Sequence, residues 1–487
     1  MRLHLLAAAT ALTLALAGCA SSGGLHPDGT PIDPSSLKAE RSLAKLQVSP
    51  AAWPQADWWT GLGDPQLSAL IAEALRDNPS LAVADARARQ AQAEAGIANA
   101  ARSPTLNVGA AVDATRLPGT AFPPSFGAGH YAPADYLYAS FKWDLDLWGG
   151  KRAAWEASLG QARAVEIEAR AARIELSGNV ARAYVQLGYA YAQQDVAKAE
   201  LARAQEVGTL THQRVDAGID NQLQLKQTDS EVASAEGQHA VADRAVDSAR
   251  SALSMLLGKG PDRGLDIARP QLMQPSLLTV PANLPVDLLG HRADLVAARW
   301  RVEAANKNIK AAKTEFLPNI SLSALTGFLA VGKGVNPLQM PARFYSVGPS
   351  ISLPIFDGGR LRANLNGSDA QYDLAVAQYN QTLVGALNEV SDDYDAVNSV
   401  QLQIEAEQRA LNAASDAWKL AELRYKAGIG SFLEALSARQ QLLVAEQRMA
   451  ALSAQQTDLS VQLIQALGGG YRPQADAELS PPTSHRS

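Results

Sequence analysis

The sequence predicts a mainly α-helical protein with some β-strand, built from two copies of one unit. The first observation is internal repetition. RSPTLNV around Pro104 returns as EFLPNIS around Pro318, and RVDAGI, which contains Gly218, returns as RYKAGI, which contains Gly428. The second observation is a pair of alternating apolar and polar segments in each copy, and the third is a long proline-free segment after each pair. Repetition in the same order at a nearly fixed offset indicates a duplicated architecture.

The N-terminal segment is predicted to be an export signal. Arg2 precedes an apolar run, Leu5 to Ala17, that is too short to span a bilayer as a mature helix. The residues LAGC that end at Cys19 resemble a bacterial lipobox, in which the cysteine receives a covalent lipid, and Ala20 after it favours the outer membrane over inner-membrane retention. Several acyl chains would make a durable anchor. The alternative is an incidental cysteine behind an ordinary signal peptide.

The composition argues against several classes of function. Hydrophobic residues make up 47% of the chain but aromatic residues only 6%, which favours close helix packing. A net charge of −6 argues against nucleic-acid binding. The seven histidines are scattered, and GxSxG, HExxH and CxxC motifs do not occur. We therefore predict no enzyme, no metal and no cofactor other than a lipid on Cys19.

Each copy begins with a helix that is followed by two strands. Helices are predicted over 78–101 and 292–315, each ending just before a proline. Residues 105–115, 136–147, 319–324 and 346–355 alternate apolar and polar residues with period two. Four such strands of about ten residues are typical of outer-membrane barrels, although a soluble sheet over a core is the alternative. Because four strands cannot close a water-filled barrel, we expect several chains to share one.

Long helical hairpins follow the strand pairs. Apolar residues recur every seventh position from Val376 to Tyr425, and a thinner seam runs from Leu176 to Ala204. This spacing predicts coiled coils. A helix over 150–207 would be about 87 Å long at about 1.5 Å per residue, nearly three times the ~30 Å bilayer core, so it would project out of the membrane. Gly218 and Gly428 are expected to end these helices as left-handed residues, after which each chain segment turns back as a second helix.

These features, taken in order, resemble the TolC-like outer-membrane factor family, and in particular the OprM/NodT-type efflux lipoproteins. The resemblance rests on the lipobox, the duplicated strand pairs and hairpins, the paired tips, HRADLVAARWRVEAA at 291–305 and ALGGGY at 466–471, and it covers residues 58–471. Ala293 stands where the family commonly has proline, and Ser437 where OprM-like members often have an acidic residue.

The resemblance implies a homotrimer with a roughly twelve-stranded β-barrel and a periplasmic tunnel of helical hairpins. It implies a bacterial outer-membrane channel that passively exports drugs or other small molecules, with a periplasmic adaptor (membrane fusion) protein and an inner-membrane RND or MFS pump as partners. The alternatives are a type I secretion duct for polypeptides and a non-conducting periplasmic scaffold or adaptor, which would have one hairpin and no barrel strands.

The implied domain order has six segments. They are a signal peptide (1–18), a lipid-anchored N-terminal tail (19–57), repeat 1 (58–260), an equatorial linker (261–290), repeat 2 (291–471) and a flexible C-terminal tail (472–487). Residues 22–34 also have the glycine and proline content of a flexible segment.

By resemblance, the periplasmic gate comprises Tyr425, Lys426, Leu433 and Ser437. In the alternative interpretation Tyr425 only ends the heptad seam and Leu433 packs between helices. An exchange of ion-pair partners between Lys426 and Asp216 of the other tip is also considered, although an exposed pair contributes only about 0–1 kcal/mol.

The implied adaptor-docking residues belong to the doubled tip motif. They are Arg214, Gly218, Ile219, Arg424, Gly428 and Ile429. In the alternative interpretation the glycines only make turns.

Two further groups of residues are of interest. The acidic residues Asp392, Asp393 and Asp395 are expected to form a solvated face of the lumen, with an ion or substrate filter as the sharper alternative. Trp53, Trp58 and Trp59 are expected to pack on the equatorial belt rather than at a membrane interface.

Overall fold

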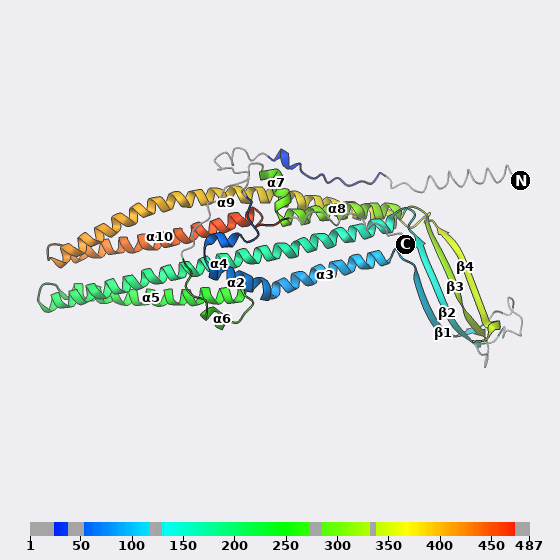
Figure 1. Ribbon diagram of the computed structural model, residues 1–487, viewed down its shortest axis with the longest axis horizontal. Coiled ribbons are helices and arrows are strands. Elements are labelled where there is room, and N and C mark those ends of the chain that lie inside the picture. The colour runs from blue at the N-terminus through cyan, green and yellow to red at the C-terminus, as the bar shows by residue number, and fades with distance from the viewer. Residues whose placement is uncertain are drawn as a thin grey trace. The chain divides into compact units, whose positions relative to one another are not determined.

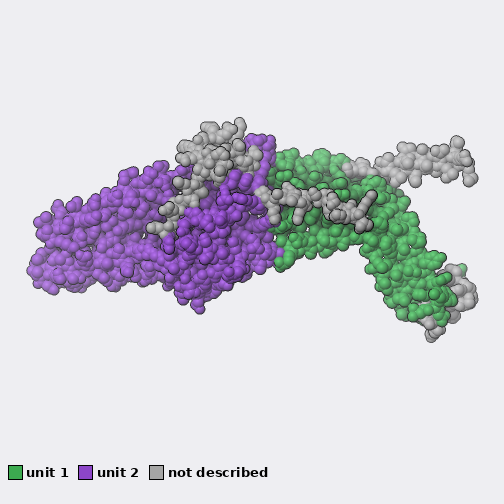
Figure 2. Space-filling model, viewed as in Figure 1, with its two compact units in different colours: residues 1–31, 87–166, 297–380 green, residues 32–86, 167–296, 381–487 purple. Residues whose placement is uncertain are grey.

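The computed structural model describes residues 24–37, 53–116, 118, 120, 129, 131–271, 284–331 and 338–472. The described chain is mainly helical and contains one β-sheet (Figure 1). It divides into two compact units, each assembled from three separate segments (Figure 2). Unit 1 comprises residues 1–31, 87–166 and 297–380, and unit 2 comprises residues 32–86, 167–296 and 381–487. The predicted signal peptide, Cys19 and residues 473–487 of the C-terminal tail lie outside the described residues.

Unit 1 contains a four-stranded antiparallel sheet in the order β1-β2-β3-β4. The strands are β1 (Thr105–Arg116), β2 (Tyr131–Leu145), β3 (Asn319–Val331) and β4 (Arg343–Ser352). All four predicted strands are therefore confirmed. β2 begins at Tyr131, earlier than the alternation indicated, because its first residues pair with the end of β1, where Tyr131 lies opposite Arg116. β3 continues to Val331 because it pairs along its length with β2, from Ile320 opposite Leu145 to Val331 opposite Ala134.

The two faces of the sheet differ in polarity. One cross-strand row on the first face consists of Leu106, Phe141, Ala324 and Val347. Apolar side chains of β1 and β4 on this face are exposed; they include Val108, Val112, Tyr345 and Ile351. The opposite face carries rows such as Thr105, Lys142 and Ser323. The register thus keeps one face of the sheet apolar and the other largely polar.

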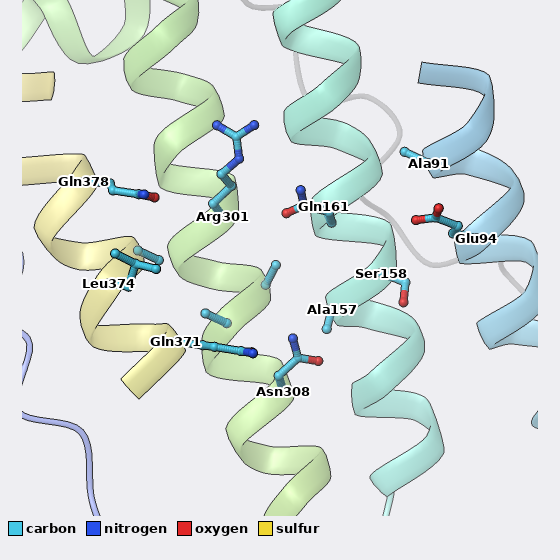
Figure 3. Close-up of a pocket in the computed structure, with 13 residues that line it drawn as sticks. Ala91, Glu94, Ala157, Ser158, Gln161, Arg301, Asn308, Gln371, Leu374 and Gln378 are labelled. Atoms are coloured by element: carbon cyan, nitrogen blue, oxygen red, sulfur yellow. The ribbon is translucent and has the colours of Figure 1, made fainter. Parts of the chain in front are cut away.

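Four helices contribute to the rest of unit 1, namely α3 (Pro79–Ala100), α4 (Gly150–Asp216), α8 (Ala293–Thr314) and α9 (Arg360–Lys426). Figure 3 shows them side by side, with α4 between α3 and α8. Small residues separate them: Ala91 and Ala95 of α3 pack on Ala162 of α4, and a Cβ on Gly160 would lie 3.2 Å from the Cβ of Ala304. This close packing agrees with the alanine-rich composition.

Residues 24–31 lie against α8 and α9 of unit 1, whereas the composition of residues 22–34 predicted a flexible segment. Leu25 packs on a cluster that contains Phe316 and Leu365. The Gly29 amide donates a hydrogen bond to Asp373 Oδ1 at 2.6 Å. A Cβ at Gly29 would lie within 2.9–3.2 Å of Asp373 and Val376. Glycine at position 29 permits two backbones to approach closely. A high glycine content is also typical of flexible segments, so composition alone does not distinguish the two.

Unit 2 contains two helical hairpins and the shorter helices around them. α4 returns as α5 (Gln222–Leu256), and α9 returns as α10 (Phe432–Ala466). The shorter elements are η1 (Pro34–Ser36), η2 (Trp58–Leu62), α2 (Pro65–Asp77), α6 (Asp262–Leu265) and α7 (Leu284–His291), while η4 (Met340–Ala342) precedes β4 in unit 1. At 67 residues, α4 is about 100 Å long. It continues past the predicted Val207 up to the glycine cap.

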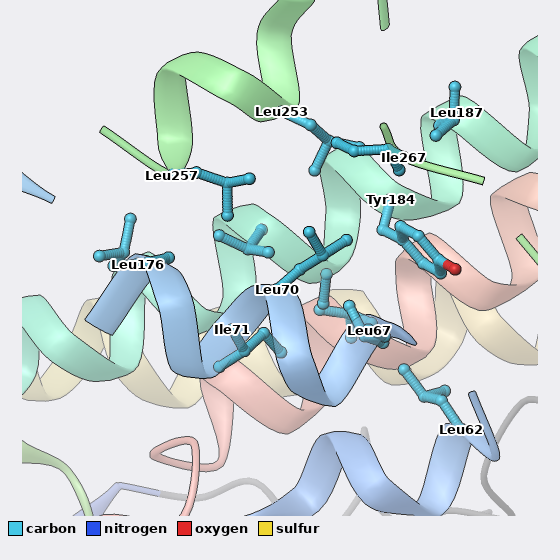
Figure 4. Close-up of a cluster of buried hydrophobic side chains, with 14 of the residues drawn as sticks. Leu62, Leu67, Leu70, Ile71, Leu176, Tyr184, Leu187, Leu253, Leu257 and Ile267 are labelled. Atoms are coloured by element: carbon cyan, nitrogen blue, oxygen red, sulfur yellow. The ribbon is translucent and has the colours of Figure 1, made fainter. Parts of the chain in front are cut away.

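The main core of unit 2 forms where α2 packs on α4 and α5. Figure 4 shows Leu67, Leu70 and Ile71 of α2 beside Tyr184 of α4 and Leu253 of α5.

Polar contacts fix the start of α2 against this core. Asp64 Oδ1 accepts the Gln66 amide at 2.8 Å, and Asp64 Oδ2 accepts the Tyr184 hydroxyl at 2.7 Å. Trp58 is buried in the same core and Trp59 packs against it, whereas Trp53 stacks on His291 with ring centroids 3.8 Å apart. Within the described ranges, no helix combines the length and hydropathy that a bilayer-spanning segment requires.

Candidate functional site: the paired hairpin tips

The two hairpins end in the same backbone motif. Gly218 has φ +71° and Gly428 has φ +76°, which confirms the predicted left-handed caps. The Ile219 amide donates to the Arg214 carbonyl at 2.8 Å, and the Ile429 amide donates to the Arg424 carbonyl at 3.0 Å. These bonds satisfy carbonyls that would otherwise lack partners at the helix end, so each tip leaves its helix in a fixed direction.

The returning helices also begin alike. The Asn221 side chain accepts a hydrogen bond from the backbone amide of Gln224 at 3.1 Å, and the Gln224 side chain accepts one from the backbone amide of Asn221 at 2.8 Å. Ser431 and Glu434 make the same reciprocal pair at 3.1 and 3.3 Å. Both tips are therefore short loops held at each end by backbone hydrogen bonds.

A polar cluster, which we call the tip lock, joins the two hairpins. It consists of Arg214, Asp220 and Tyr425. Arg214 binds Asp220 through Nε and Nη2, at 2.8 and 3.2 Å, and its guanidinium lies 4.8 Å from the centroid of the Tyr425 ring. The Tyr425 hydroxyl donates to Asp220 Oδ2 at 2.9 Å. Because Arg214 and Asp220 belong to the first tip and Tyr425 to the second, this cluster holds the tips together.

Burial strengthens the tip lock. Tyr425 is only 1% exposed, and burial raises the pKa of its hydroxyl. The hydrogen bonds from Arg214 lower the pKa of Asp220, so this carboxylate is charged at neutral pH. Tyr425 also packs edge-on to Phe432, at 5.9 Å between ring centroids, in a cluster with Trp418. Tyr425 thus does end the heptad seam in this chain, and it carries a polar link as well.

Lys426 lies at the surface beside the tip lock. Its ammonium group is 2.9 Å from Glu206 of α4 and 3.0 Å from Glu422 of α9. These carboxylates raise the pKa of Lys426, with Glu206 contributing most. Its partner on the first hairpin is therefore Glu206, not Asp216, because α4 presents Glu206 about three turns before its end.

The remaining gate candidates are exposed in the single chain. Leu433 is 70% exposed and Ser437 is also exposed. Leu433 therefore does not pack between the helices of its own chain. Leu223, its counterpart in the first copy of the repeat, is 66% exposed at the same place in the first tip. The repeat offset that identified the glycine pair could have identified this second leucine.

The docking candidates divide into two kinds. Ile219 and Ile429 are exposed at the ends of their tips. Arg424 is exposed as well. Arg214 is of the second kind, because its side chain is only 15% exposed and forms an ion pair with Asp220. The structure thus gives Arg214 an internal role within the tip lock.

A buried ionic cluster lies behind the tips and was not predicted. The side chain of Arg439 on α10 is 3% exposed, with Nε 3.1 Å from Glu200 Oε1 and Nη2 2.9 Å from Glu231 Oε2. Arg203 lies 2.6 Å from Glu446. Burial raises the pKa of Glu200 in spite of the nearby arginines. The cluster joins residues of α4, α5 and α10 that follow no shared motif, so no sequence pattern indicated it.

The three aspartates of α9 occupy different environments. Asp392 and Asp395 are exposed, whereas Asp393 is partly buried. Burial, together with Glu389 and Asp392, raises the pKa of Asp393 to about 6. The three residues therefore do not form one uniformly solvated face in this chain. Among the described residues, no group of His, Cys, Asp and Glu side chains has the arrangement of a metal site.

Four helices of unit 1 line a groove that carries several amide side chains. A cavity of about 350 Å³ lies over α3, α4, α8 and α9 (Figure 3). Its lining includes the amide side chains of Gln161, Asn308, Gln371 and Gln378.

Comparisons with known proteins agree with this architecture. The model of the outer membrane efflux protein family matches residues 70–259 and 284–469. The fusaric acid resistance protein FusA of Burkholderia cepacia is 37% identical over 368 residues, which cover 74% of this chain and 69% of that protein. The toluene efflux pump outer membrane protein TtgF of Pseudomonas putida is 31% identical over 476 residues, which cover 97% of this chain and 98% of that protein.

A solved structure has the same fold. The outer membrane protein VceC of Vibrio cholerae superimposes with a TM-score of 0.79 at 36% identity, over 86% of this chain and 100% of that chain. The two segments matched by the family model contain both hairpins and all four strands. Because one family model matches the segments that contain the strands, the hairpins and their capped tips, this chain belongs to the outer membrane efflux protein family.

Proposed function

We propose that this protein is the outer-membrane channel of a tripartite efflux pump and passively exports small molecules. The observation that carries this proposal is the family match over both copies of the unit, joined to relatives named for toluene efflux and fusaric acid resistance. An adaptor and an inner-membrane pump are the partners that such a channel requires. The protein is a transporter, not an enzyme.

The sheet supports a shared barrel. In the order β1-β2-β3-β4, β1 and β4 are edge strands, and both carry exposed apolar side chains on one face. A membrane does not tolerate open sheet edges, because unpaired backbone groups have no water to bind there. Three copies of the four strands would close the roughly twelve-stranded barrel of a homotrimer.

The N-terminal segment supports lipidation at Cys19. Leu25 packs near Phe316, which lies just before the start of β3 at Asn319. The chain from Cys19 to Leu25 is short, and when extended it spans about 20 Å. A lipid on Cys19 would therefore reach the membrane surface next to the sheet.

The tips support a gate that is closed by links between hairpins. The tip lock and the Lys426–Glu206 pair both connect the first hairpin to the second. Leu433 and Ser437 are exposed in the single chain and would contact sister subunits, while Ile219, Gly218, Ile429, Gly428 and Arg424 would meet an adaptor. Opening would then require the hairpins of one chain to separate.

A non-conducting scaffold is disfavoured by the four strands and the second hairpin, and a polypeptide duct by the named relatives. The test is export in cells. A deletion strain should accumulate toxic small molecules and become more susceptible to them, and the wild-type gene should restore resistance. Unchanged susceptibility to a broad panel of small molecules, with loss of a secreted polypeptide instead, would contradict the proposal.

A further inference from the structure

A second cavity of unit 1 lies where the sheet meets the helices. Its volume is about 710 Å³. Its lining combines four cationic side chains with two indoles, namely Arg102, Arg152, Lys307, Lys310, Trp143 and Trp148. Neither the gate nor the docking surface uses these residues.

Both carboxylates of this cavity are already engaged. Asp146 accepts the backbone amides of Lys151 and Arg152 at 3.0 and 2.8 Å, which caps the start of α4. Glu156 binds Arg152 at 2.8 Å and Lys307 at 2.6 Å. Mainly through the hydrogen bond from Lys307, the pKa of Glu156 is lowered, so it is charged at neutral pH.

The cations exceed these carboxylates. Arg102 lies over the Trp155 ring, 4.7 Å from its centroid, and donates to Asn99 at 3.0 Å. Across the described part of the chain, no carboxylate lies within ion-pair distance of the Lys310 ammonium group. Four cations and two carboxylates leave the cavity with a positive excess, which favours an anion.

The indoles are fixed in place and remain accessible. Trp143 Nε1 donates to the Arg102 carbonyl at 3.2 Å, and Trp148 Nε1 donates to the Pro318 carbonyl at 2.7 Å. Trp143 is 38% and Trp148 47% exposed. An indole with its polar edge satisfied and its apolar face open suits the boundary between lipid and water.

The register places the cavity at the border of the apolar sheet face. Trp143 is two residues from Phe141 on β2, so both lie on the face that carries Leu106 and Val347. β2 ends at Leu145 and α4 begins at Gly150, so the basic residues of α4 follow immediately after the apolar strand. If the sheet spans the membrane as proposed, the cavity lies at the level of the lipid headgroups.

We propose that this cavity binds the phosphate of an anionic phospholipid headgroup in the leaflet nearer the helices. Lys310 and Arg102 contact the phosphate, and Trp143, Trp148 and the exposed Leu147 contact the first part of an acyl chain. The site holds each subunit at a fixed depth. This inference rests on the membrane placement of the sheet, not on export.

The test counts the lipids retained by the full-length protein. The purified protein is equilibrated in nanodiscs with equal amounts of phosphatidylglycerol and phosphatidylcholine, released into mild detergent and analysed by native mass spectrometry. We expect the wild type to retain phosphatidylglycerol preferentially. Lys310→Gln should lower that preference about fivefold, since one lysine is lost at an anionic surface, and Lys310→Arg should restore it.

Lys419→Gln is the matched control, because it removes an exposed lysine that pairs with Asp416 in the distal part of α9. Equal retention of both lipids by the wild type, or an equal loss in the control, overturns the proposal. Full displacement of the lipid by millimolar inorganic phosphate would assign the site to a soluble anion and also overturns it. Drug resistance of the Lys310→Gln strain separates the two proposals. Loss of resistance with normal phosphatidylglycerol retention would affect only the proposed channel function. Loss of phosphatidylglycerol retention with normal resistance would affect only the proposed lipid site.

Discussion

At the first hairpin tip, Arg214 and Asp220 form an ion pair beside the glycine cap, whereas the second tip has Arg424 and Gly430 at the same two places of the repeat. Both tips keep the same cap, because the amides of residues 220 and 430 each bond to the arginine carbonyl, at 3.2 and 3.0 Å. A Cβ at Gly430 would lie 2.9 Å from the Cβ of Arg424. The two tips thus share the hydrogen bonds of the cap and differ in their side chains.

This difference shows how two similar hairpins are linked. The second tip places Tyr425 where the first has Val215, and Lys426 where the first has Asp216. Each tip therefore contributes a complementary part, since the acidic residues Asp220 and Glu206 come from the first hairpin and their hydroxyl and ammonium partners from the second. Two identical tips could not form these contacts.

The largest expected effect is that of Tyr425→Ala. Removing a buried aromatic side chain costs about 3–5 kcal/mol, and here it also leaves Asp220 without one donor. We expect hydrogen exchange of both tips to accelerate strongly. Tyr425→Phe retains the ring and should cost only about 1 kcal/mol. Equal exchange in the alanine variant and the wild type would show that the tips are held by something else.

Asp220→Asn should have the next largest effect, about 1.5–3 kcal/mol, because it removes a charge-assisted pair. The lowered pKa of Asp220 means that its contribution is present above the unfolded pKa, near 4, and is lost as the pH falls through the lower folded value. Tip protection in the wild type should therefore fall only at acidic pH.

The asparagine variant should lack this pH step, while Asp216→Asn, an exposed neighbour in the same tip, should keep it. A pH step of unchanged size in Asp220→Asn would exclude this carboxylate as its source.

Gly428→Ala should cost about 1–2 kcal/mol, because φ +76° is strained for any residue with a Cβ. The matched control is Gly385→Ala in the interior of α9, where a Cβ meets nothing within 4 Å. There alanine should stabilise the helix by about 0.5–1 kcal/mol. Thermal melting of the two variants should shift in opposite directions, and a shift in the same direction would argue against the cap.

Lys426→Gln should have the smallest effect, about 0–1 kcal/mol, because Lys426 and its partner Glu206 on the first hairpin are both exposed. The rate of amide hydrogen exchange in the tips should rise slightly, and its difference from the wild-type rate should vanish at high salt. An effect as large as that of Tyr425→Ala would place the main link at the lysine.

The fold was largely predictable because its signals are local. Strand alternation indicated the sheet, sevenfold spacing indicated the long helices, and the doubled glycines indicated the caps at Gly218 and Gly428. The early start of β2 was not predicted because its first residues are held by pairing with the end of β1. The extension of β3 to Val331 was not predicted because it depends on pairing with β2, which belongs to the other copy of the repeat and is far away in the sequence. The packing of residues 24–37 was not predicted, because a high glycine content is compatible both with a flexible segment and with close backbone contact.

The site was predictable only in part. Tyr425 and Lys426 were found through family resemblance, but their partners Asp220 and Glu206 lie in the other copy of the repeat and follow no motif. The sequence did show that the two tips differ, because Val215, Asp216 and Asp220 have Tyr425, Lys426 and Gly430 as counterparts, but it did not show which residues pair across the tips. The ionic cluster around Arg439 left no such sign, because charged residues at helical spacing more often face water.

The most direct test of the central claim, that this protein is a channel closed by its hairpin tips, is conductance in planar lipid bilayers. We predict small or gated currents for the wild-type protein and larger, stable currents when Leu433 and Lys426 are both replaced by small polar residues. Absence of current from the wild type and from every tip variant would contradict the claim.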